Sequence, residues 1–265
     1  MSQLLCGLIL CIVASNSADA LPSCDLERSE TSRVVSIVDG DTVVLQDGRE
    51  VRLVGLQAPK LALGRPNFTD WPLAIEAREV LAALVKNEDV QLSYGGRRED
   101  RYGRLLAHLF LADGRWVQGA MIAKGMARVY SFPDNRSCVR DLLRLEEQAR
   151  GMRRAIWDQS YYAVLPADEP HRLLTHLDSF QLVEGTVKRA ALVRGRLYLN
   201  FGDDWRKDFT ATIAPKHLRQ FSDDLEVYRD ARIRVRGWIK SYNGPEIVVT
   251  HPEQIEFLDG PGRAS

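Results

Sequence analysis

The sequence predicts an α+β fold that is mainly β: a five-stranded barrel with three helices, followed by a second, smaller β-barrel. Three observations support this fold class. Residues 33–54 are short apolar runs separated by two Asp-Gly pairs, a strong hairpin signal. Further apolar runs then alternate with three helical segments up to residue 157, and residues 179–258 hold five more short runs. Five strands with helices gathered at one end are typical of a partly open barrel of the OB type.

The elements of the first unit follow in order. Residues 33–54 predict three strands joined by two turns. Pro72 suits the first turn of a helix because its missing N–H would be unpaired there. That helix is predicted at 74–85, with an apolar face that includes Ile75, Leu81, Leu84 and Val85. The remaining elements are two strands at 90–92 and 105–110, a helix at 116–124 stopped by Gly125, and a helix at 139–157.

The second unit begins after an acidic, proline-bounded stretch at 166–170, which predicts a linker. Its five strands are predicted at 180–187, 197–201, 209–213, 232–239 and 247–250, with one helix at 215–228. A helix between the third and fourth strands is compatible with a second OB-like barrel. The predicted boundaries are a leader at 1–20, a first domain at 31–160, a linker at 161–178 and a C-terminal domain at 179–258.

Composition sets limits on the partners. The 265 residues are 45% hydrophobic and 27% charged, an ordinary globular balance long enough for two modest domains. Lys plus Arg and Asp plus Glu both number 36, so the net charge is zero. Nucleic-acid-binding proteins are often basic overall. Any affinity for phosphate must therefore come from local clusters of cations.

The first twenty residues predict an export leader. Residues 4–14 are an almost unbroken apolar run, too short to span a bilayer, and an Ala-x-Ala cleavage pattern ends at Ala20. No Lys or Arg precedes the run, which departs from the usual leader. The alternative is a lipoprotein leader ending at Cys24, although Pro22 fits it poorly. The expected location is periplasmic or extracellular, with no transmembrane span.

Cysteine usage allows one disulfide. Cys6 and Cys11 lie in the predicted leader, which leaves Cys24 and Cys138 in the mature chain. In an oxidising compartment a remaining pair indicates a disulfide, and two unrelated thiols are the alternative. The five histidines are scattered, without metal-ligand spacing.

Three patches carry the chemistry. They are Val-Asp-Gly-Asp-Thr at 38–42, Val-Arg-Leu-Val-Gly-Leu-Gln-Ala-Pro-Lys at 51–60 and Asp-Arg-Tyr-Gly-Arg at 100–104. Their order and spacing resemble the thermonuclease (staphylococcal-type nuclease) family, whose patches read D-G-D-T, R-L-x-x-[VI]-D-[TA]-P-E and D-x-Y-G-R. The resemblance covers residues 33–157, about half of the chain. It is specific because three separated motifs recur in order.

The resemblance implies a role for each matching residue. Arg52 and Arg104 match the arginines that grip the phosphate and stabilise its developing charge, a task suited to the planar guanidinium fork. Arg101 and Tyr102 match positions that contact a terminal phosphate, although Tyr102 could equally be barrel packing. An ion pair between Arg52 and Asp41 is the structural alternative for Arg52.

Two carboxylates of the family pattern are missing. Asp41 matches one acidic ligand of calcium, but Gln57 stands where the family carries the second, and Lys60 stands where it carries the glutamate assigned as general base. Calcium prefers oxygen ligands, mostly carboxylates and carbonyls. Because Gln57 brings no charge, the resemblance implies only a weak metal site at Asp41 and Gln57, and calcium as a doubtful cofactor.

Lys60 changes the chemistry most. A lysine is normally protonated, with a reference pKa of about 10.4, so it is a poor general base. One interpretation makes Lys60 a third phosphate clamp in a cationic cleft. The other lets a nearby acid, Asp39 or Glu99, replace the lost base so that slow metal-dependent cleavage persists. Together the two replacements move the cleft three charge units toward positive.

A further group of arginines lies in the second unit. Arg232, Arg234 and Arg236 alternate with Ile233 and Val235, which places all three guanidinium groups on one face of a strand. With Trp205, Trp238 and Tyr242 as stacking surfaces, they could form a single-strand binding face. The alternative is a solvated face paired with Asp203, Asp204 or Asp208.

Two functions from different classes remain. The first is an exported thermonuclease-like protein that acts on or binds nucleic-acid phosphodiesters, DNA or RNA, with family-type calcium-dependent cleavage weak or lost. The second is a non-catalytic envelope module that binds nucleic acid or another anion in the same cleft. A scaffold in which these residues form only ion pairs is a third, weaker possibility. The oligomeric state is not predicted.

Overall fold

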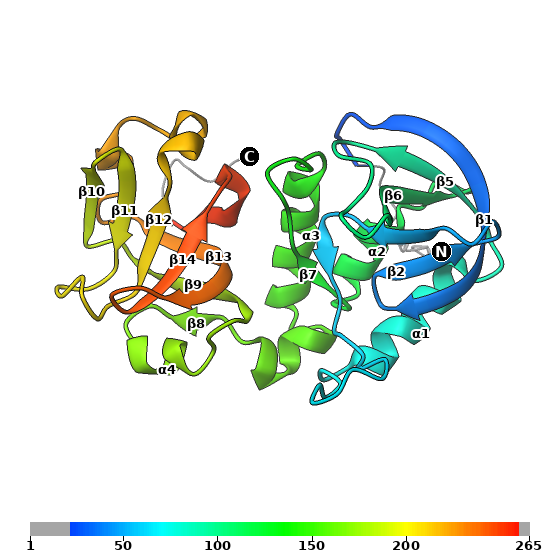
Figure 1. The fold of residues 1–265 in the computed structure, drawn as a ribbon, viewed down its shortest axis with the longest axis horizontal. Coiled ribbons are helices and arrows are strands. Elements are labelled where there is room, and N and C mark those ends of the chain that lie inside the picture. Colours follow the sequence, from blue (N-terminus) through cyan, green and yellow to red (C-terminus); the bar gives the residue numbers. More distant parts are fainter. Residues whose placement is uncertain (1–21, 260–265) are drawn as a thin grey trace, which may run out of the picture.

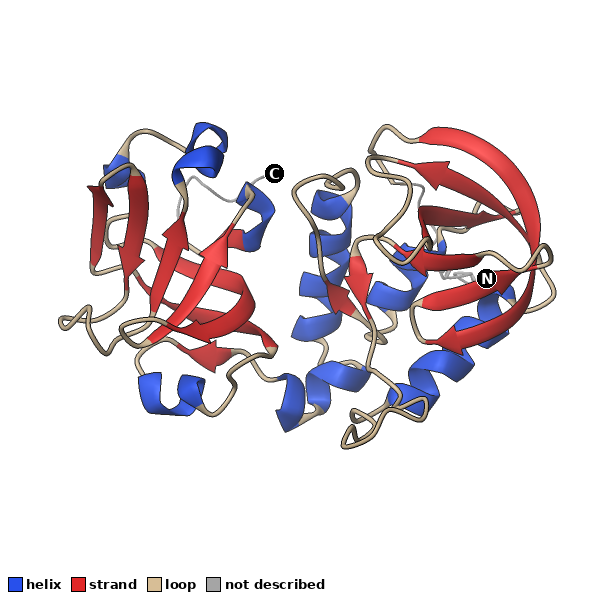
Figure 2. Cartoon of the chain, in the orientation of Figure 1, coloured by secondary structure: helices blue, strands red, loops and turns tan. Residues whose placement is uncertain are grey.

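The computed structural model describes residues 22–259, which form two β-rich units joined through a helical layer (Figures 1 and 2). The predicted leader at 1–20 lies outside the described residues. Within them, no helix has the length and apolar character needed to cross a membrane. The predicted fold class is confirmed: a closed five-stranded barrel with three helices is followed by a curled β-sheet.

The barrel contains the three sequence patches. Its strands close in the order β1 (Glu27–Asp39), β2 (Thr42–Leu45), β3 (Glu50–Leu53), β6 (Leu105–Leu111) and β5 (Asp89–Tyr94). Both predicted Asp-Gly turns join neighbouring strands. Gly48, in the second, has φ +87°, which a side chain would strain. At Gly40, in the first, a Cβ would come within 2.7 Å of the Ala58 Cβ, so glycine lets the 56–60 segment pack against the turn.

Helices α1 (Ala74–Val85), α2 (Val117–Ala123) and α3 (Val139–Gly151) pack against the barrel. The α1 helix has the predicted bounds, but Ile75 is 48% exposed, so its assignment to the apolar face was wrong. The third helix ends at Gly151 rather than at residue 157. Arg153 and Ala155 have positive φ values that break it, and the chain continues as the 3-10 helix η2 (Ala155–Asp158).

The second unit is a curled sheet with more strands than predicted. Its order is β10 (Arg189–Val193), β11 (Arg196–Asn200), β12 (Thr210–Ile213), β14 (Pro245–Val249), β13 (Arg232–Ser241), β9 (Phe180–Thr186) and β8 (Leu165–Pro166), with β15 (Ile255–Phe257) also paired to β13. A separate two-stranded sheet, β4 (Leu56–Gln57) with β7 (Arg128–Val129), lies on the barrel side.

Two predictions for this unit were wrong. The 161–178 segment is not a free linker: β8 pairs with β9, Ala167 is buried in the second core, and α4 (Pro170–Leu174) buries Leu173 there. The predicted helix at 215–228 is two short 3-10 helices, η4 (Pro215–Gln220) and η5 (Leu225–Val227). Phe221 between them is extended, which interrupts helical hydrogen bonding.

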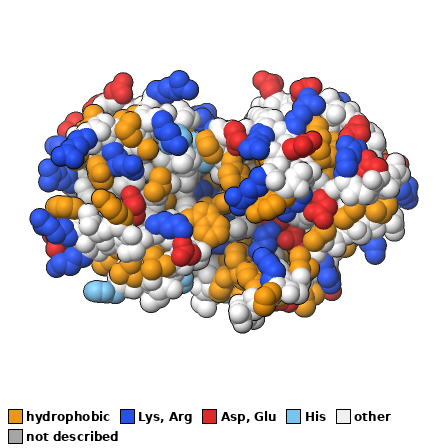
Figure 3. Space-filling view, in the orientation of Figure 1, with side chains coloured by type: hydrophobic (Ala, Val, Ile, Leu, Met, Phe, Trp, Pro, Cys, Tyr) orange, Lys and Arg blue, Asp and Glu red, His pale blue; other side chains and the backbone are white. Residues whose placement is uncertain are grey.

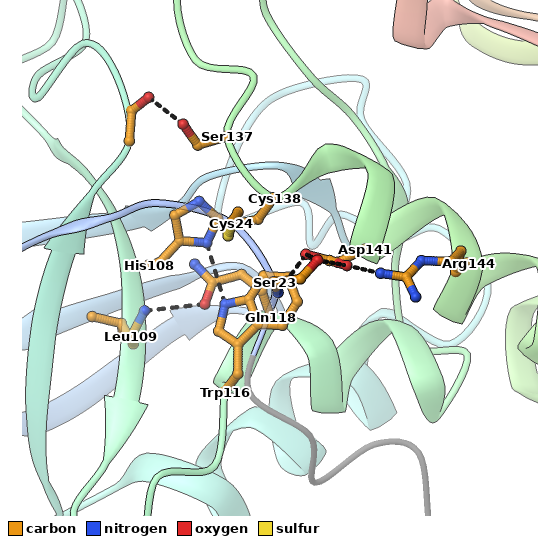
Figure 4. Close-up of a disulfide and its surroundings, with 11 residues drawn as sticks. Ser23, Cys24, His108, Leu109, Trp116, Gln118, Ser137, Cys138, Asp141 and Arg144 are labelled. Atoms are coloured by element: carbon orange, nitrogen blue, oxygen red, sulfur yellow. Dashed lines mark hydrogen bonds and ion pairs between the residues drawn. A yellow bond between two sulfur atoms is a disulfide. The ribbon is translucent and has the colours of Figure 1, made fainter. Parts of the chain in front are cut away.

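A disulfide ties the N-terminal segment to α3. Cys24 and Cys138 are bonded, with their Cα atoms 5.0 Å apart and a sequence separation of 114 (Figure 4). Next to the bridge, the N–H and hydroxyl of Ser23 donate to the Asp141 carboxylate at 2.9 and 3.0 Å. Such a long closed loop constrains the unfolded chain strongly. The bridge therefore fixes the start of β1 against the helical layer.

The two units are joined by a buried ion network. Arg236 of β13, 1% exposed, donates to both carboxylate oxygens of Glu146 in α3, at 3.2 and 2.7 Å, and to Glu256. Its neighbours on the same strand are also paired: Arg232 with Glu184, and Arg234 with Glu184 and Glu256. The three arginines therefore form ion pairs with glutamates, not with the aspartates proposed from the sequence, and they do not form a binding face.

His251 belongs to the same interface and provides a pH-dependent contact. Its Nε2 lies 2.7 Å from the Ser131 hydroxyl of the first unit, and burial lowers the pKa of His251 to about 4. The unfolded chain takes up this proton near pH 6.5 and the folded chain only near pH 4, so between these values the unfolded chain binds more protons. Stability is therefore lost as the pH falls from 6.5 to 4.

We expect this loss to reach at most about 1.4 kcal/mol per pH unit. Urea unfolding of the parent and of His251→Gln at intervals between pH 7 and pH 4 measures it. Comparing the two chains removes the contribution of His108, which is also buried and has its pKa lowered to about 3. An unchanged free-energy difference across the range would contradict the assignment to His251.

Candidate functional site

The three sequence patches meet in one cleft of the barrel. Its volume is about 370 Å³, and its lining residues are Val38, Asp39, Thr42, Glu50, Arg52, Lys60, Leu63, Arg65 and Arg104. They come from the end of β1, from β2 and β3, from the loop after β4 and from the turn before β6. The barrel thus gathers cations and carboxylates that lie far apart in the sequence.

Asp41 is the buried centre of the site. Its side chain is fully buried, and its carboxylate accepts from the backbone N–H of Ala58 at 2.9 Å. Arg52 NH1 lies 2.6 Å from Oδ1, and Lys60 Nζ lies 2.6 Å and 2.7 Å from the two oxygens. Burial alone would raise the pKa of Asp41, but the charges of Arg52 and Lys60 hold it well below its usual range. Asp41 therefore stays ionised.

Arg52 carries its charge into an apolar strand because both terminal nitrogens of its guanidinium have acceptors there. Besides Asp41, NH2 donates to the Leu56 carbonyl at 3.0 Å and NH1 lies 3.3 Å from the Asp41 carbonyl. The side chain is 12% exposed and still lines the cleft. The ion pair named as the structural alternative is present, and it leaves one edge of Arg52 at the cleft surface.

Lys60 makes three short contacts, all with carboxylate oxygens. Besides the two to Asp41, its Nζ lies 3.0 Å from Asp39 Oδ2. An ammonium group has three N–H donors. The two oxygens of Asp41 lie close together and share one of these donors, and Asp39 accepts a second. Lys60 is therefore a counter-ion for the two aspartates, and at most one of its N–H groups is left for a phosphate.

Asp39 is the second aspartate of the site and lines the cleft. Burial, and then the neighbouring Asp41 charge, raises the pKa of Asp39 above its ordinary value, while Lys60 lowers it in part. Its Oδ1 also accepts from the N–H of Asp41 at 3.0 Å. Glu99 is exposed and does not line the cleft. Of the two acids proposed as substitutes for the missing base, only Asp39 is in position.

Gln57 points to a different partner. Its Oε1 accepts from Arg128 Nε at 3.3 Å and NH2 at 3.2 Å, across the β4–β7 pair. Arg128 is buried among aromatic rings, Phe180 and Tyr162 among them, and burial lowers the pKa of Arg128 to about 10. The amide oxygen that would have to ligate a metal is thus held by a cation.

Arg104 occupies the mouth of the cleft. Its Nε and NH2 lie 2.8 and 2.7 Å from Asp100 Oδ2, and 30% of its side chain is exposed. The same aspartate accepts from the N–H of Tyr102 at 2.8 Å, so the turn holds itself together. Tyr102 is 70% exposed and lies under Arg101 and Arg104, with ring-to-guanidinium distances of 5.0 and 5.6 Å. Packing inside the barrel is therefore not its role.

Sequence reasoning missed two charged residues of the cleft, Arg65 and Glu50. Arg65 donates to the backbone carbonyls of Leu61 and Ala62 and lies 3.9 Å over the Phe68 ring. No carboxylate lies within ion-pair distance of it among residues 22–259. It belongs to an irregular loop without periodicity, so no sequence signal pointed to it.

The donor set does not fit a calcium ion. Both oxygens of Asp41 already have cationic donors, Lys60 bridges Asp39 and Asp41, and Gln57 is bonded to Arg128. Within the described part of the chain, no three His, Cys, Asp or Glu side chains are grouped to hold a metal. A divalent ion at Asp41 would have to displace the ammonium of Lys60 and would be repelled by Arg52.

Comparison with known proteins agrees with the motifs. Residues 50–159 match the family described as staphylococcal nuclease homologue. The chain is 29% identical over 134 residues to a thermonuclease of Staphylococcus hyicus, covering 49% of this chain and 77% of that protein. It is 30% identical over 131 residues to an uncharacterized endonuclease of Escherichia coli O157:H7, covering 48% of this chain and 77% of that protein. To endonuclease YncB of Bacillus subtilis (strain 168) it is 35% identical over 131 residues, covering 47% and 60%.

Proposed function

Since the chain belongs to the staphylococcal nuclease homologue family, we propose that it binds nucleic-acid phosphodiesters, of DNA or RNA, in the cleft of its barrel. We further propose that Lys60 has taken the place of a metal ion there, so that family-type calcium-dependent hydrolysis is weak or lost. The observation that carries this proposal is the position of Lys60 Nζ, 2.6–3.0 Å from three oxygens of Asp39 and Asp41.

The proposal assigns each cation a task. Lys60 and Arg52 neutralise Asp41 and Asp39, which would otherwise repel a phosphate. Arg104 and Arg65 then supply the attraction: Arg65 has no carboxylate partner in the described part of the chain, and the part-exposed Arg104 can exchange Asp100 for a phosphate oxygen. Arg101 and Tyr102 lie beside Arg104 and would contact a neighbouring phosphate. A guanidinium makes paired hydrogen bonds to phosphate, which suits this exchange.

Hydrolysis would need a group that activates water. Lys60 cannot do this while it donates to two carboxylates. Asp39, with its raised pKa and its place in the cleft lining, is the candidate for a residual, slow reaction. Loss of slow cleavage in Asp39→Asn, with binding retained, would support this second candidate function. The alternative of a purely non-catalytic binding module predicts no cleavage in either chain.

Export is also part of the proposal. Disulfides persist in oxidising compartments, and the Cys24–Cys138 bridge fits a periplasmic or extracellular protein. Because the sulfur of Cys24 is bonded to Cys138, it is not free to carry a lipid. We therefore favour a leader removed near Ala20 over a lipid anchor at Cys24.

Binding is tested with labelled DNA and RNA oligonucleotides at several salt concentrations, with calcium or with EDTA. We expect affinity to fall linearly with salt on logarithmic axes and to be unaffected by EDTA. Arg104→Ala should weaken binding about tenfold, because a charge-assisted contact is lost. Arg115→Ala is the matched control, since Arg115 pairs with Asp113 in the same way, Nε to Oδ2 at 2.7 Å, outside the cleft. Equal losses in both variants would count against the cleft.

A further inference from the structure

We propose that the second unit carries its own binding site for single-stranded nucleic acid, in a hollow on the sheet face opposite its core. The hollow has a volume of about 410 Å³ and lies over β10, β11, β12 and the start of β14. These strands lie at the end of the molecule away from the barrel (Figure 1). The site lies outside residues 50–159, which match the nuclease family, and goes beyond the function proposed for the cleft.

The floor of the hollow is polar and ordered. Asn200, Thr210 and Thr212 are each at least nine-tenths buried. The hydroxyl of Thr210 donates to Asn200 Oδ1 at 3.1 Å, and that of Thr212 donates to Glu246 at 2.6 Å. The two N–H groups of the Asn200 side-chain amide have no partner within the described residues, although this side chain lines the hollow. They are donors available to the edge of a ligand such as a base.

The walls are aromatic and exposed. Trp205 is 48% exposed and Tyr242 is 67% exposed, and both line the hollow, as does Tyr198 of β11. Exposed apolar side chains that are grouped in one place and rimmed by polar residues are typical of binding sites. Bases of single strands stack on such rings, and the contact tolerates any sequence because every base has a π face.

The two outer rings are held in place by their loops. In the 202–208 loop, the N–H of Asp204 donates to the Asp208 carboxylate at 2.7 Å, and Lys207 pairs with Asp204 at 3.1 Å. The turn after Tyr242 packs onto this loop so closely that a Cβ on Gly244 would lie 2.6 Å from the backbone of Lys207. The loops that carry Trp205 and Tyr242 are therefore ordered and in contact with each other, which lowers the cost of binding.

We infer an anionic ligand from the cations around the hollow, since its one lining carboxylate, Glu246, already accepts from Thr212. Arg189 lines it, Arg206 lies 4.6 Å over the Trp205 ring, and Lys188, Arg194 and Arg196 lie on the same hairpin or its turn. Unlike the arginines of β13, none of these side chains has a carboxylate within ion-pair distance among residues 22–259. Figure 3 shows Lys and Arg gathered along this outer edge. A neutral sugar would stack on the rings but would not need these cations.

The test uses the full chain, EDTA and a fluorescein-labelled oligothymidylate of about twelve nucleotides, a length within the range for one small barrel. Fluorescence anisotropy measures the dissociation constant. We expect Trp205→Ala to weaken binding about tenfold, which corresponds to the loss of one stacked base, and Trp205→Phe to stay within about threefold. Arg189→Ala should reduce the slope of log affinity against log salt by about 0.7, the value for one phosphate of a single strand.

The controls separate this site from the cleft. Arg219→Ala removes an exposed arginine of the same unit that does not line the hollow, and it should change nothing. Repeating the titrations in an Arg104→Ala background shows which binding remains when the cleft is weakened. If Arg104→Ala loses binding and Trp205→Ala does not, the cleft binds the oligonucleotide and the proposal for the hollow is wrong. If Trp205→Ala loses binding and Arg104→Ala does not, the hollow is the binding site and the cleft is not. Binding of a neutral oligosaccharide that Trp205→Ala abolishes, with oligothymidylate binding intact, would also overturn the proposal.

Discussion

Replacing Arg236 with methionine is expected to lower the free energy of unfolding by about 3–5 kcal/mol, the usual cost of removing one partner of a buried ion pair. Arg236 is 1% exposed and Glu146 is fully buried, and the guanidinium also donates to the Val129 carbonyl at 3.1 Å. Without Arg236, Glu146 keeps Arg150 at 3.2 Å and the N–H of Val129 at 2.6 Å, which cannot fully replace it. The desolvation of the buried Glu146 carboxylate is then no longer fully compensated.

Urea unfolding, followed by circular dichroism and by tryptophan fluorescence, measures this loss. Because Arg236 joins the two units, we also expect the variant to unfold in two separated steps instead of one. Arg232→Met is the matched control, since Arg232 lies on the same face of β13 with 54% of its side chain exposed. Exposed ion pairs contribute at most about 1 kcal/mol, so its effect should be small. Equal effects at the two positions would show that the buried network does not hold the units together.

The sequence predicted what depends on local patterns. Asp-Gly pairs marked the barrel hairpins, because turns follow from neighbouring residues. The prediction that Pro72 lies in the first turn of α1 was wrong, since the helix begins at Ala74 and Leu73 is its N-cap. The order of three motifs located the cleft. The disulfide was one of two open possibilities, since cysteine count alone does not fix pairing.

Pairings across the fold could not be predicted in this way. Gln57 bonds to Arg128, 71 positions away, and Arg236 bonds to Glu146, 90 positions away. Arginines that alternate along a strand look the same in sequence whether they face solvent or a second domain. Arg65 was missed for a related reason, because an irregular loop has no period that shows where its side chains lie. The role of Lys60 follows from the distances between its Nζ and the oxygens of Asp39 and Asp41, which the spacing of these residues in the sequence does not give.

Replacing Lys60 with glutamate is expected to create a calcium site where the chain now has an ion pair. The change removes one positive charge and adds one negative charge beside Asp39 and Asp41, so three carboxylates converge where an ammonium bridged two. Without calcium, their repulsion should destabilise the fold. With calcium at a hundred times its dissociation constant, binding should restore about 2.7 kcal/mol. Thermal unfolding with calcium and with EDTA measures this difference independently of activity.

The same variant should gain cleavage of DNA or RNA that requires calcium, since a carboxylate at a base position contributes about 10²–10⁴-fold to rate. Lys60→Gln is the matched control: it removes the ammonium without adding a carboxylate, and it should show neither the thermal shift nor the cleavage. Gln57→Asp alone should also fail, because Arg128 is already in place to pair with the new carboxylate. If the parent chain itself gains stability in calcium, Lys60 does not occupy the cation position, and the charge exchange proposed for this cleft is wrong.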